Sequence, residues 1–414
     1  MAMATGSQTD LLVNEEHNDK NYLYPFILVT GLFFLWGFSY GLLDVLNKHF
    51  QETMGVSKAR SGLLQAAYFG AYFLVGLPAE FFMLRYGYKK GILLGLSLFA
   101  AGAFLFYVFA LLDVPNDTRF SYFLVAFLIL ASGITFLETA ANPYASVLGN
   151  PSSSEFRLNL SQSFNGVGSV LGPLVGGALF FSGKNDSSSS VQLVYIVIGV
   201  VVTLFAILIS YTRLPEIKES KLVSEKEQDI KPLFAHRHFI WAVVAQFFYV
   251  AAQVGIAAFF INYCTEADSS ISNAQAANLL GTSLLLFTIG RFTGSALMKK
   301  VAPHTLLALY ALINVLLCAV VVYTKGAVAV YALMAVFFFM SIMFPTIFAL
   351  GVKDLGHHTK QGSSFLVMAV AGGAVMPYFM GLLATPLTAT AYLIPMFCFV
   401  LIAFFGWRGY RTHP

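Results

Sequence analysis

The sequence predicts an all-α membrane protein with twelve transmembrane helices in two six-helix halves. Three observations lead to this prediction. Hydrophobic residues make up 58% of the 414 residues and charged residues only 11%, and the mean hydropathy is +0.74. A soluble domain of this composition would expose large apolar patches to water. The apolar residues fall into twelve runs, and one long charged segment separates these runs into two sets of six.

Each expected span is a run of about 20 mainly apolar residues, the length that a membrane helix needs. The connections between the runs are mostly short and contain Gly, Pro, Asn or charged residues, which interrupt helices. In chain order, the expected spans cover 24–47, 61–84, 90–112, 120–149, 157–181, 192–212, 239–264, 275–298, 304–324, 327–351, 362–384 and 388–407.

The longest connection, 213–238, mixes both signs of charge and separates the two sets of spans. Short segments recur in the same order in both sets; Pro345, for example, corresponds to Pro143. Such recurrence favours two related, pseudo-symmetric halves. The expected organisation is an N-terminal tail at 1–22, a first bundle at 23–212, a linker at 213–238, a second bundle at 239–407 and a short tail at 408–414.

We expect both chain termini in the cytoplasm, because Lys and Arg are enriched in cytoplasmic connections. The connections on the side of the termini hold 17 of the 24 Lys and Arg residues, against six on the other side. The protein is therefore expected to be an integral protein of the cell membrane, in contact with lipid and monomeric. Two sequons, at Asn116 and Asn185, fall in connections assigned to the outside. Both would be N-glycosylation sites in a eukaryotic cell.

Several classes of function are disfavoured. The net charge of +4 includes no basic stripe of the kind that binds nucleic acid. The three cysteines are scattered, which argues against a disulfide framework or a metal site. Without a phosphate loop or a hydrolase motif, we expect no enzyme, cofactor or metal. Two histidine pairs lack partner ligands and are expected to be solvated, namely His236 with His238 and His357 with His358.

The acidic residues inside spans are the strongest functional candidates, because such groups are costly in lipid and typically face a cavity or a partner. Asp44 in the first span shares a helical face with Trp36, Tyr40 and Asn47. This combination of aromatic rings and a carboxylate suits a sugar. Glu138 in the fourth span is the second candidate.

Polar side chains form stripes on other spans as well. Asn142 follows Glu138 by four residues, and the fifth span carries Gln162 and Asn165 on one face. The seventh span carries Tyr249 and Gln253 in the same way, together with Gln246. These amides could equally form hydrogen bonds between helices. Four converging stripes with two carboxylates favour a hydrated central cavity.

Small residues predict close helix packing. Gly168, Gly172 and Gly176 recur every four residues in the fifth span, and Gly290 and Gly294 do so in the eighth. Arg291 lies between the last two and is expected to anchor the cytoplasmic end of its span.

The sequence also resembles a known family. The two-halved plan is similar to the major facilitator superfamily, and Arg85, Gly87 and Lys89 match part of that superfamily's motif A. More specific segments resemble the fucose–galactose–glucose:proton symporter family over most of residues 24–407. They are FFLWG (33–37), LETAANPYASVLG (137–149), FRLNLSQSFN (156–165), AQFFYVAAQ (245–253), IGRFTG (289–294) and MSIMFPTIFALGVKDLG (340–356).

The resemblance implies roles for individual residues. Asp44 and Glu138 match the acidic residues that serve proton coupling and substrate recognition in the family. Gln162, Asn165 and Gln253 match residues that bind sugar hydroxyls. Arg85, Lys89, Arg157 and Arg291 are assigned to the cytoplasmic gate or to structural contacts.

Three departures from the family bear on the substrate. Tyr40 and Gly41 replace an Asn pair of the fucose-transporting members, Phe344 replaces a Tyr, and Met343 replaces the Gln that precedes this Tyr. We therefore expect at least one hexose beyond L-fucose, with Trp36, Tyr40 and Phe344 in the site. The predicted function is proton-coupled symport of a monosaccharide such as L-fucose, galactose or glucose by alternating access. A passive sugar facilitator and a sugar sensor that does not transport remain alternatives.

Overall fold

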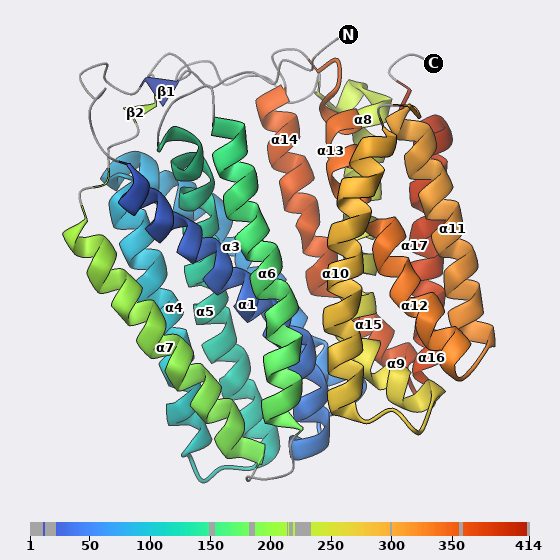
Figure 1. The fold of residues 1–414 in the computed structure, drawn as a ribbon, viewed down its shortest axis with the longest axis horizontal. Coiled ribbons are helices and arrows are strands. Elements are labelled where there is room, and N and C mark those ends of the chain that lie inside the picture. The colour runs from blue at the N-terminus through green and yellow to red at the C-terminus, as the bar shows by residue number, and fades with distance from the viewer. Residues whose placement is uncertain are drawn as a thin grey trace.

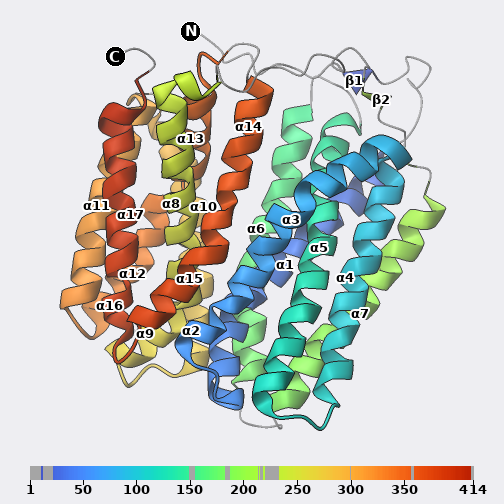
Figure 2. The ribbon, with the colours of Figure 1, turned by 180° about the vertical axis from the view of Figure 1, so that it is seen from behind.

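The computed structural model describes residues 11–12, 22–148, 154–181, 187–212, 214, 218–219, 233–298, 300–355 and 359–411. These residues form two groups of long helices that stand side by side (Figures 1 and 2). The first long helix begins and the last one ends at the top of Figure 1. This end of the bundle is called the terminal side, and the other end is called the opposite side.

The first group, or N half, contains six long helices, each continuous between its ends. Their bounds are α1 Leu23–Met54, α3 Leu63–Tyr86, α4 Tyr88–Ala110, α5 Asn116–Val147, α6 Ser154–Phe180 and α7 Ser187–Tyr211. The short helix α2 (Lys58–Ser61) precedes α3 and is capped by Ser57, whose hydroxyl accepts a hydrogen bond from the backbone N–H of Arg60.

The second group, or C half, contains several interrupted helices. The bounds are η4 Leu233–Ala235, α8 Arg237–Ala258, α9 Phe260–Ala267, α10 Asn273–Leu297, α11 Pro303–Tyr323, α12 Ala327–Met340, α13 Met343–Val352, α14 Thr359–Met368, η6 Ala369–Ala371, α15 Gly372–Leu383, α16 Thr388–Ala391, α17 Leu393–Phe404 and η7 Phe405–Gly409. Two interruptions have a local cause, because a proline ring clashes with the carbonyl group four residues earlier. Pro345 and Pro395 lie four residues after Ser341 and Ala391, where α12 and α16 end.

The described helices account for all twelve expected spans. Eleven segments are long and apolar enough to cross a membrane by length and composition. The twelfth is α10, whose 25 residues pack against α6 and α12. Polar residues such as Asn273, Gln275 and Arg291 lower its hydropathy. The predicted all-α fold is confirmed, and one pair of two-residue strands, β1 (Leu11–Leu12) and β2 (Lys218–Glu219), is an addition to it.

Glycine brings α1 and α6 into backbone contact, as the four-residue spacing on α6 predicts. A Cβ atom at Gly168 would lie 2.4 Å from the carbonyl oxygen of Phe34, and one at Gly172 would lie 2.6 Å from the carbonyl carbon of Gly41. Neither distance leaves room for a side chain. On α10, a Cβ atom at Gly290 would lie 2.4 Å from the carbonyl oxygen of Phe338 on α12. The packing prediction is confirmed for both helices.

The two halves contact each other mainly through helix pairs α6 with α10, α3 with α15, α2 with α15, and α1 with α8 and α9. The close approach of Gly62 to Pro377 and of Gly381 to Ala59 lies in this interface. From the opposite side, where α2, α9 and α16 gather, the ribbons of the two halves diverge towards the terminal side (Figure 2).

The prediction for His238 is wrong. This residue is 1% exposed rather than solvated, because its ring Nε2 lies 2.8 Å from the carbonyl oxygen of Lys353 and is covered by the bundle. His236 contacts His238 with ring centroids 5.8 Å apart. The pair His357 and His358 lies outside the described residues.

Candidate functional site

Asp44 lies on α1 at membrane depth and is 3% exposed. The amide Nε2 of Gln65 on α3 lies 3.4 Å from Asp44 Oδ1 and donates a weak hydrogen bond to it. Asn47, one turn further along α1, is fully buried and donates to Gln65 Oε1 over 3.1 Å. Asp44 lies ten residues before Met54, where α1 ends on the opposite side. It is therefore about 15 Å from that end of the helix.

Glu138 lies on α5 and is partly exposed. The hydroxyl of Tyr72 on α3 donates to Glu138 Oε2 over 2.7 Å. Because α5 runs in the reverse direction and ends at Val147, Glu138 lies about 14 Å from the terminal end of its helix. The two carboxylates therefore lie at different depths of the N half.

A row of side chains on α3 lies between the two carboxylates. Gln65, Tyr68 and Tyr72 are spaced by three and four residues and share one face of the helix. The hydroxyls of Tyr68 and Tyr72 are 3.3 Å apart, and the ring centroids of Tyr40 and Tyr68 are 5.9 Å apart. Asp44 and Glu138 thus border one continuous polar wall.

Two amides of α6 approach this wall. The side-chain Nε2 of the exposed Gln162 donates to Asn142 Oδ1 over 3.1 Å, and Asn142 Nδ2 donates to the backbone carbonyl of Glu138 over 3.0 Å. Asn165 is partly buried and donates to the carbonyl of Phe33 on α1 over 3.3 Å. Gln162 and Asn142 therefore belong to the surroundings of Glu138, whereas Asn165 lies at the contact between α1 and α6.

The aromatic residues of the expected site differ in exposure. Trp36 is 4% exposed and packs on Phe33 with ring centroids 4.3 Å apart. Tyr40 is partly exposed and contacts Tyr68 of α3. Phe344 on α13 is partly exposed and meets the fully buried Tyr249 with ring centroids 6.2 Å apart. Tyr40 and Phe344 are thus more accessible to a ligand than Trp36.

Helix α8 contributes polar groups from the C half. Gln253 is partly exposed. Gln246 is fully buried, and neither polar atom of its side chain has a hydrogen-bond partner among the described residues. The same holds for the hydroxyl of Tyr249. A buried polar group without a partner costs about 1–3 kcal/mol, so these atoms keep hydrogen-bonding capacity that the described residues leave unused.

The four basic residues that were assigned to the cytoplasmic gate or to structural contacts make the following contacts within their own half. Lys89 Nζ donates to the carbonyl oxygens of Ser210 and Thr212, each over 2.8 Å, and so joins α4 to the end of α7. Arg157 donates to the carbonyl of Ala145 over 3.1 Å. The guanidinium groups of Arg85 and Arg291 lie over the rings of their neighbours Tyr86 and Phe287, 5.3 and 5.0 Å from the centroids.

On the opposite side, side chains join the two halves directly. Lys58 Nζ on α2 donates to Glu266 Oε1 on α9 over 2.5 Å and to Thr388 Oγ1 on α16 over 2.9 Å. Asn273 Nδ2 on α10 donates to both carboxylate oxygens of Glu52 on α1, each over 2.7 Å. These contacts hold the halves together at this side.

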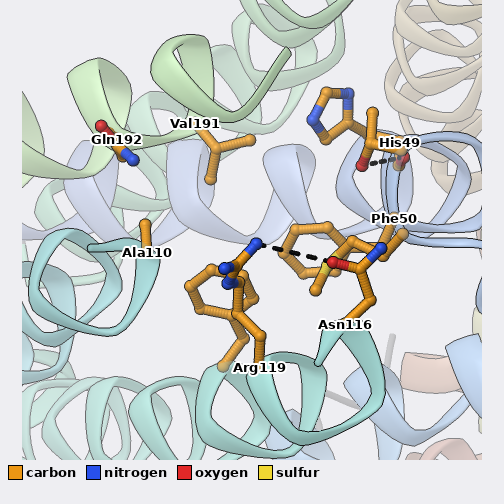
Figure 3. A pocket seen from close by; sticks show the side chains of 10 residues that line it. His49, Phe50, Ala110, Asn116, Arg119, Val191 and Gln192 are labelled. Atoms are coloured by element: carbon orange, nitrogen blue, oxygen red, sulfur yellow. Dashed lines mark hydrogen bonds between the residues drawn. The ribbon is translucent and has the colours of Figure 1, made fainter. Parts of the chain in front are cut away.

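A pocket of about 30 Å³ lies within the N half near the opposite side (Figure 3). His49, Asn116 and Arg119 line it, and Arg119 approaches Asn116 Oδ1 at 3.5 Å. Asn116, the first sequon residue, is exposed at the start of α5, whereas Asn185 lies outside the described residues. Within the described part of the chain, no group of three His, Cys, Asp or Glu residues could hold a metal ion.

Sequence reasoning missed the contribution of α3. Gln65, Tyr68 and Tyr72 contact or approach the two carboxylates, and their helical spacing was visible in the sequence. Gln51 and Asn262, which form a hydrogen bond between the halves, were missed as well. No sequence pattern could have paired these two, because they lie 211 residues apart.

Comparisons with known proteins assign this arrangement to a family. The model of the Major Facilitator Superfamily matches residues 29–377. An L-fucose-proton symporter of Escherichia coli is 39% identical, covering 94% of this chain and 93% of that protein. A glucose/galactose transporter of Brucella abortus is 35% identical, covering 99% of this chain and 100% of that protein.

A solved structure supports the same assignment. The crystal structure of the transporter FucP in the outward conformation is 38% identical over 94% of this chain and 99% of that chain, with a TM-score of 0.66. The motifs quoted above resemble those of the L-fucose-proton symporter, which agrees with these matches. This chain therefore belongs to the major facilitator superfamily, and within it to the fucose–galactose–glucose:proton symporter family.

Proposed function

We propose that the protein is a proton-coupled symporter of a monosaccharide that works by alternating access. The observation that carries this proposal is the polar wall of the N half, in which Asp44 and Glu138 lie at membrane depth among phenols and amides. Ionisable groups in this position are typical of proton relays and substrate pathways in transporters. The names of the relatives, an L-fucose-proton symporter and a glucose/galactose transporter, support the same reaction.

In this proposal, Asp44 and Glu138 take up and release the coupled proton. The amides of Gln162, Asn165 and Gln253 bind sugar hydroxyls, each able to donate and accept a hydrogen bond. Tyr40 and Phe344 contribute aromatic faces from the two halves. The site thus draws on both halves, as alternating access by rocking requires.

The membrane orientation is part of the proposal. We assign the terminal side to the cytoplasm because most Lys and Arg residues lie in its connections. The contacts between the halves on the opposite side then close the outer entrance, through Lys58 with Glu266 and Glu52 with Asn273. In this orientation, the ribbons of the two halves diverge towards the cytoplasmic side (Figure 2). The protein acts as a monomer in the cell membrane. Its two bundles, 23–212 and 239–407, are joined by the linker 213–238 and flanked by the tails 1–22 and 408–414.

The substrate is proposed to include at least one hexose besides L-fucose. Tyr40 and Phe344 stand where fucose-transporting members carry Asn and Tyr, so the site offers fewer hydrogen bonds and more apolar ring surface. A site that bonds each hydroxyl rejects sugars that lack one, and removing such partners relaxes the discrimination. Galactose and glucose are the first candidates.

Counterflow in proteoliposomes tests the proposal with a panel of fucose, galactose, glucose, mannose and arabinose. A pH indicator inside the vesicles reports proton entry during sugar uptake. We expect exchange of more than one sugar and proton entry that depends on sugar. Sugar exchange without proton entry would identify a passive facilitator, and saturable binding without exchange would identify a sensor. Transport of L-fucose alone would contradict the substrate proposal.

A further inference from the structure

An unbroken chain of side-chain amides connects Asp44 with the contact between the two halves. Asn262 Nδ2 donates to Gln51 Oε1 over 2.6 Å, and Gln51 Nε2 donates to Asn47 Oδ1 over 2.7 Å. Asn47 Nδ2 donates to Gln65 Oε1 over 3.1 Å, and Gln65 Nε2 donates to Asp44 Oδ1 over 3.4 Å. Every link has an amide on at least one side, and the only acidic member is at one end.

The chain crosses from one half to the other. Asp44, Asn47 and Gln51 lie on one face of α1, at spacings of three and four residues, and descend towards the opposite side. Gln65 belongs to α3, and Asn262 belongs to α9 of the C half. Asp44, Asn47, Gln65 and Asn262 are each 3% exposed or less. Water is therefore largely excluded from the chain at both of its ends.

All hydrogen bonds of the chain point the same way, towards Asp44. An amide has a donor end and an acceptor end, so the orientation of one amide determines that of the next. An ionised carboxylate can only accept, which fixes the donor end of Gln65 towards Asp44. A protonated carboxyl group can donate, and it then permits each amide to turn over. The ionisation state of Asp44 can thus select the direction of the whole chain.

The far end of the chain is able to respond to such a reversal. Asn262 Oδ1 is buried and has no hydrogen-bond partner among the described residues. In the reversed chain, this oxygen would accept from Gln51 Nε2 in place of the present bond from Asn262 Nδ2. Gln51 Nε2 also donates to Ser61 Oγ over 2.8 Å. In the reversed chain, the Ser61 hydroxyl would instead donate to Gln51 Oε1.

We propose that Gln65, Asn47, Gln51 and Asn262 are coupling residues, which transmit the protonation of Asp44 to the closure of the opposite side. Asn47 belongs to the face of α1 that was expected to suit a sugar, but it is fully buried and bonded to Gln51 and Gln65. None of the four has a described contact with Gln162, Asn165, Gln253, Tyr40 or Phe344. They act through Asp44 and through the interface, so they are positioning residues. The inference rests on the proposed proton coupling and adds the route by which the proton controls the conformation.

The titratable groups around Asp44 are compatible with this role. Tyr40 lies one helical turn before Asp44 on α1, and its ring centroid lies 5.9 Å from that of Tyr68 on α3. On α8, which also packs against α1, Tyr249 is a fully buried titratable group. Glu138 of α5 accepts a hydrogen bond from the hydroxyl of Tyr72, and no described hydrogen bond joins Glu138 directly to Asp44. The helix α6 presents backbone and Asn165 to α1, and His49 lies further along α1, where it contacts the ring of Phe180 at 5.1 Å.

A second contact in the same interface provides a matched control. Asn273 on α10 donates to Glu52 on α1, so it also joins the halves through an amide. The described hydrogen bonds of Glu52 and Asn273 do not lead to Asp44. Asn262→Ala and Asn273→Ala therefore each remove one amide from the interface, but only the first shortens the chain.

The experiment measures how pH changes the separation of the halves in the full-length protein. Spin labels are attached to cysteines introduced by Asp113→Cys in the N half and Lys325→Cys in the C half. Both positions are exposed and lie on the opposite side. The three native cysteines are buried and remain unlabelled. Distance distributions are recorded in lipid nanodiscs at acid and alkaline pH. The proton-to-sugar ratio of each variant is measured separately in proteoliposomes.

We expect the wild-type ratio of closed to open molecules to change with pH. Asn262→Ala and Gln51→Met should reduce this pH-dependent change about two- to tenfold, the effect of one neutral hydrogen bond on an equilibrium. Both variants should also lower the proton-to-sugar ratio while sugar counterflow continues. Asn273→Ala should shift the ratio of closed to open molecules as well, but it should leave the proton-to-sugar ratio unchanged.

Two results would overturn the inference. The first is an Asn262→Ala protein with the pH response and coupling of the wild type. The second is an Asn273→Ala protein that loses both as fully as Asn262→Ala, because any interface contact would then suffice. A wild type that exchanges sugar without moving protons would instead overturn the proposed function, so the two failures are distinct.

Discussion

The two halves of the protein differ in where they carry charge and in how their helices are built. In the N half, the six long helices are continuous, and two of them hold the acidic groups Asp44 and Glu138 at membrane depth. In the C half, four spans are interrupted, and α8 supplies the neutral groups of Gln246, Tyr249 and Gln253.

This difference indicates that the two halves have different roles in transport. Charged groups in lipid require fixed partners, and a continuous helix holds such partners at constant spacing. Interruptions such as the one between α12 and α13 provide points at which a helix can bend. In the proposed function, the N half therefore holds the proton site, and the C half contributes neutral groups.

The largest expected effect is the loss of coupling after neutralisation of the N-half carboxylates. Asp44→Asn and Glu138→Gln should each abolish sugar-driven proton uptake, because neither amide can carry a proton in exchange. The measurement is proton entry into proteoliposomes on addition of sugar. Asp113→Asn is the control, since Asp113 is an exposed acidic residue of the N half just after the end of α4. A variant that still accumulates sugar uphill would remove its residue from the coupling role.

The second prediction concerns the close packing of α1 against α6 within the N half. Gly172→Ala places a Cβ atom 2.6 Å from backbone and should destabilise the protein by about 1–3 kcal/mol, as overpacking does. Gly166→Ala on the same helix meets nothing within 4 Å and should leave the melting temperature nearly unchanged. Thermal unfolding in detergent compares the two. Equal melting temperatures would show that α1 and α6 can separate at no cost.

The third prediction compares sugar contacts across the halves. Gln162→Ala and Asn165→Ala in the N half, and Gln253→Ala in the C half, should each weaken apparent sugar affinity about two- to tenfold, the range for one neutral hydrogen bond. Counterflow at varied sugar concentration gives the affinities, and thermal unfolding checks the fold. Unchanged affinity in the N-half variants would assign those amides to helix packing alone.

The smallest expected effect concerns the ion pair that joins the halves on the opposite side. Lys58 and Glu266 are 20% and 30% exposed, and such pairs contribute about 0–1 kcal/mol. Glu266→Gln should therefore shift the ratio of closed to open molecules only slightly, with the larger shift at low salt. Label distances measured at two salt concentrations test this. A large shift that salt does not change would mean that hydrogen bonds to Thr388, rather than charge, hold the closure.

The sequence was sufficient for the fold because membrane spans depend on local composition. Even α10, whose polar residues lower its hydropathy, was predicted within a few residues of its ends. The interruptions at Ser341 and Tyr392 were not predicted, because the presence of a proline does not by itself predict one. Pro78 and Pro173 lie in helices that stay continuous. What decides between these outcomes is packing against neighbouring helices, which a local pattern does not contain.

The candidate site was predictable in part for the same reason. Periodicity identified Asp44, Asn142 and Gln162 on their own helices. It could not show that Asn47 binds Gln65 of α3, nor that Trp36 is covered while Tyr40 remains accessible. These are relations between helices, and they follow from the three-dimensional arrangement alone.

The backbone contact of α1 with α6 has a kinematic consequence. Where Gly37, Gly41, Gly168 and Gly172 meet, the contacts are mostly between backbone atoms, and the side chains of Asn165 and Pro173 close the remaining space, so little room is left for one helix to slide past the other. The pair consequently has few internal degrees of freedom. Asp44 on α1 and Asn165 on α6 should keep the same separation in every state of the transport cycle. The movement that exposes the sugar first to one side and then to the other must occur elsewhere, as a change of angle between whole bodies.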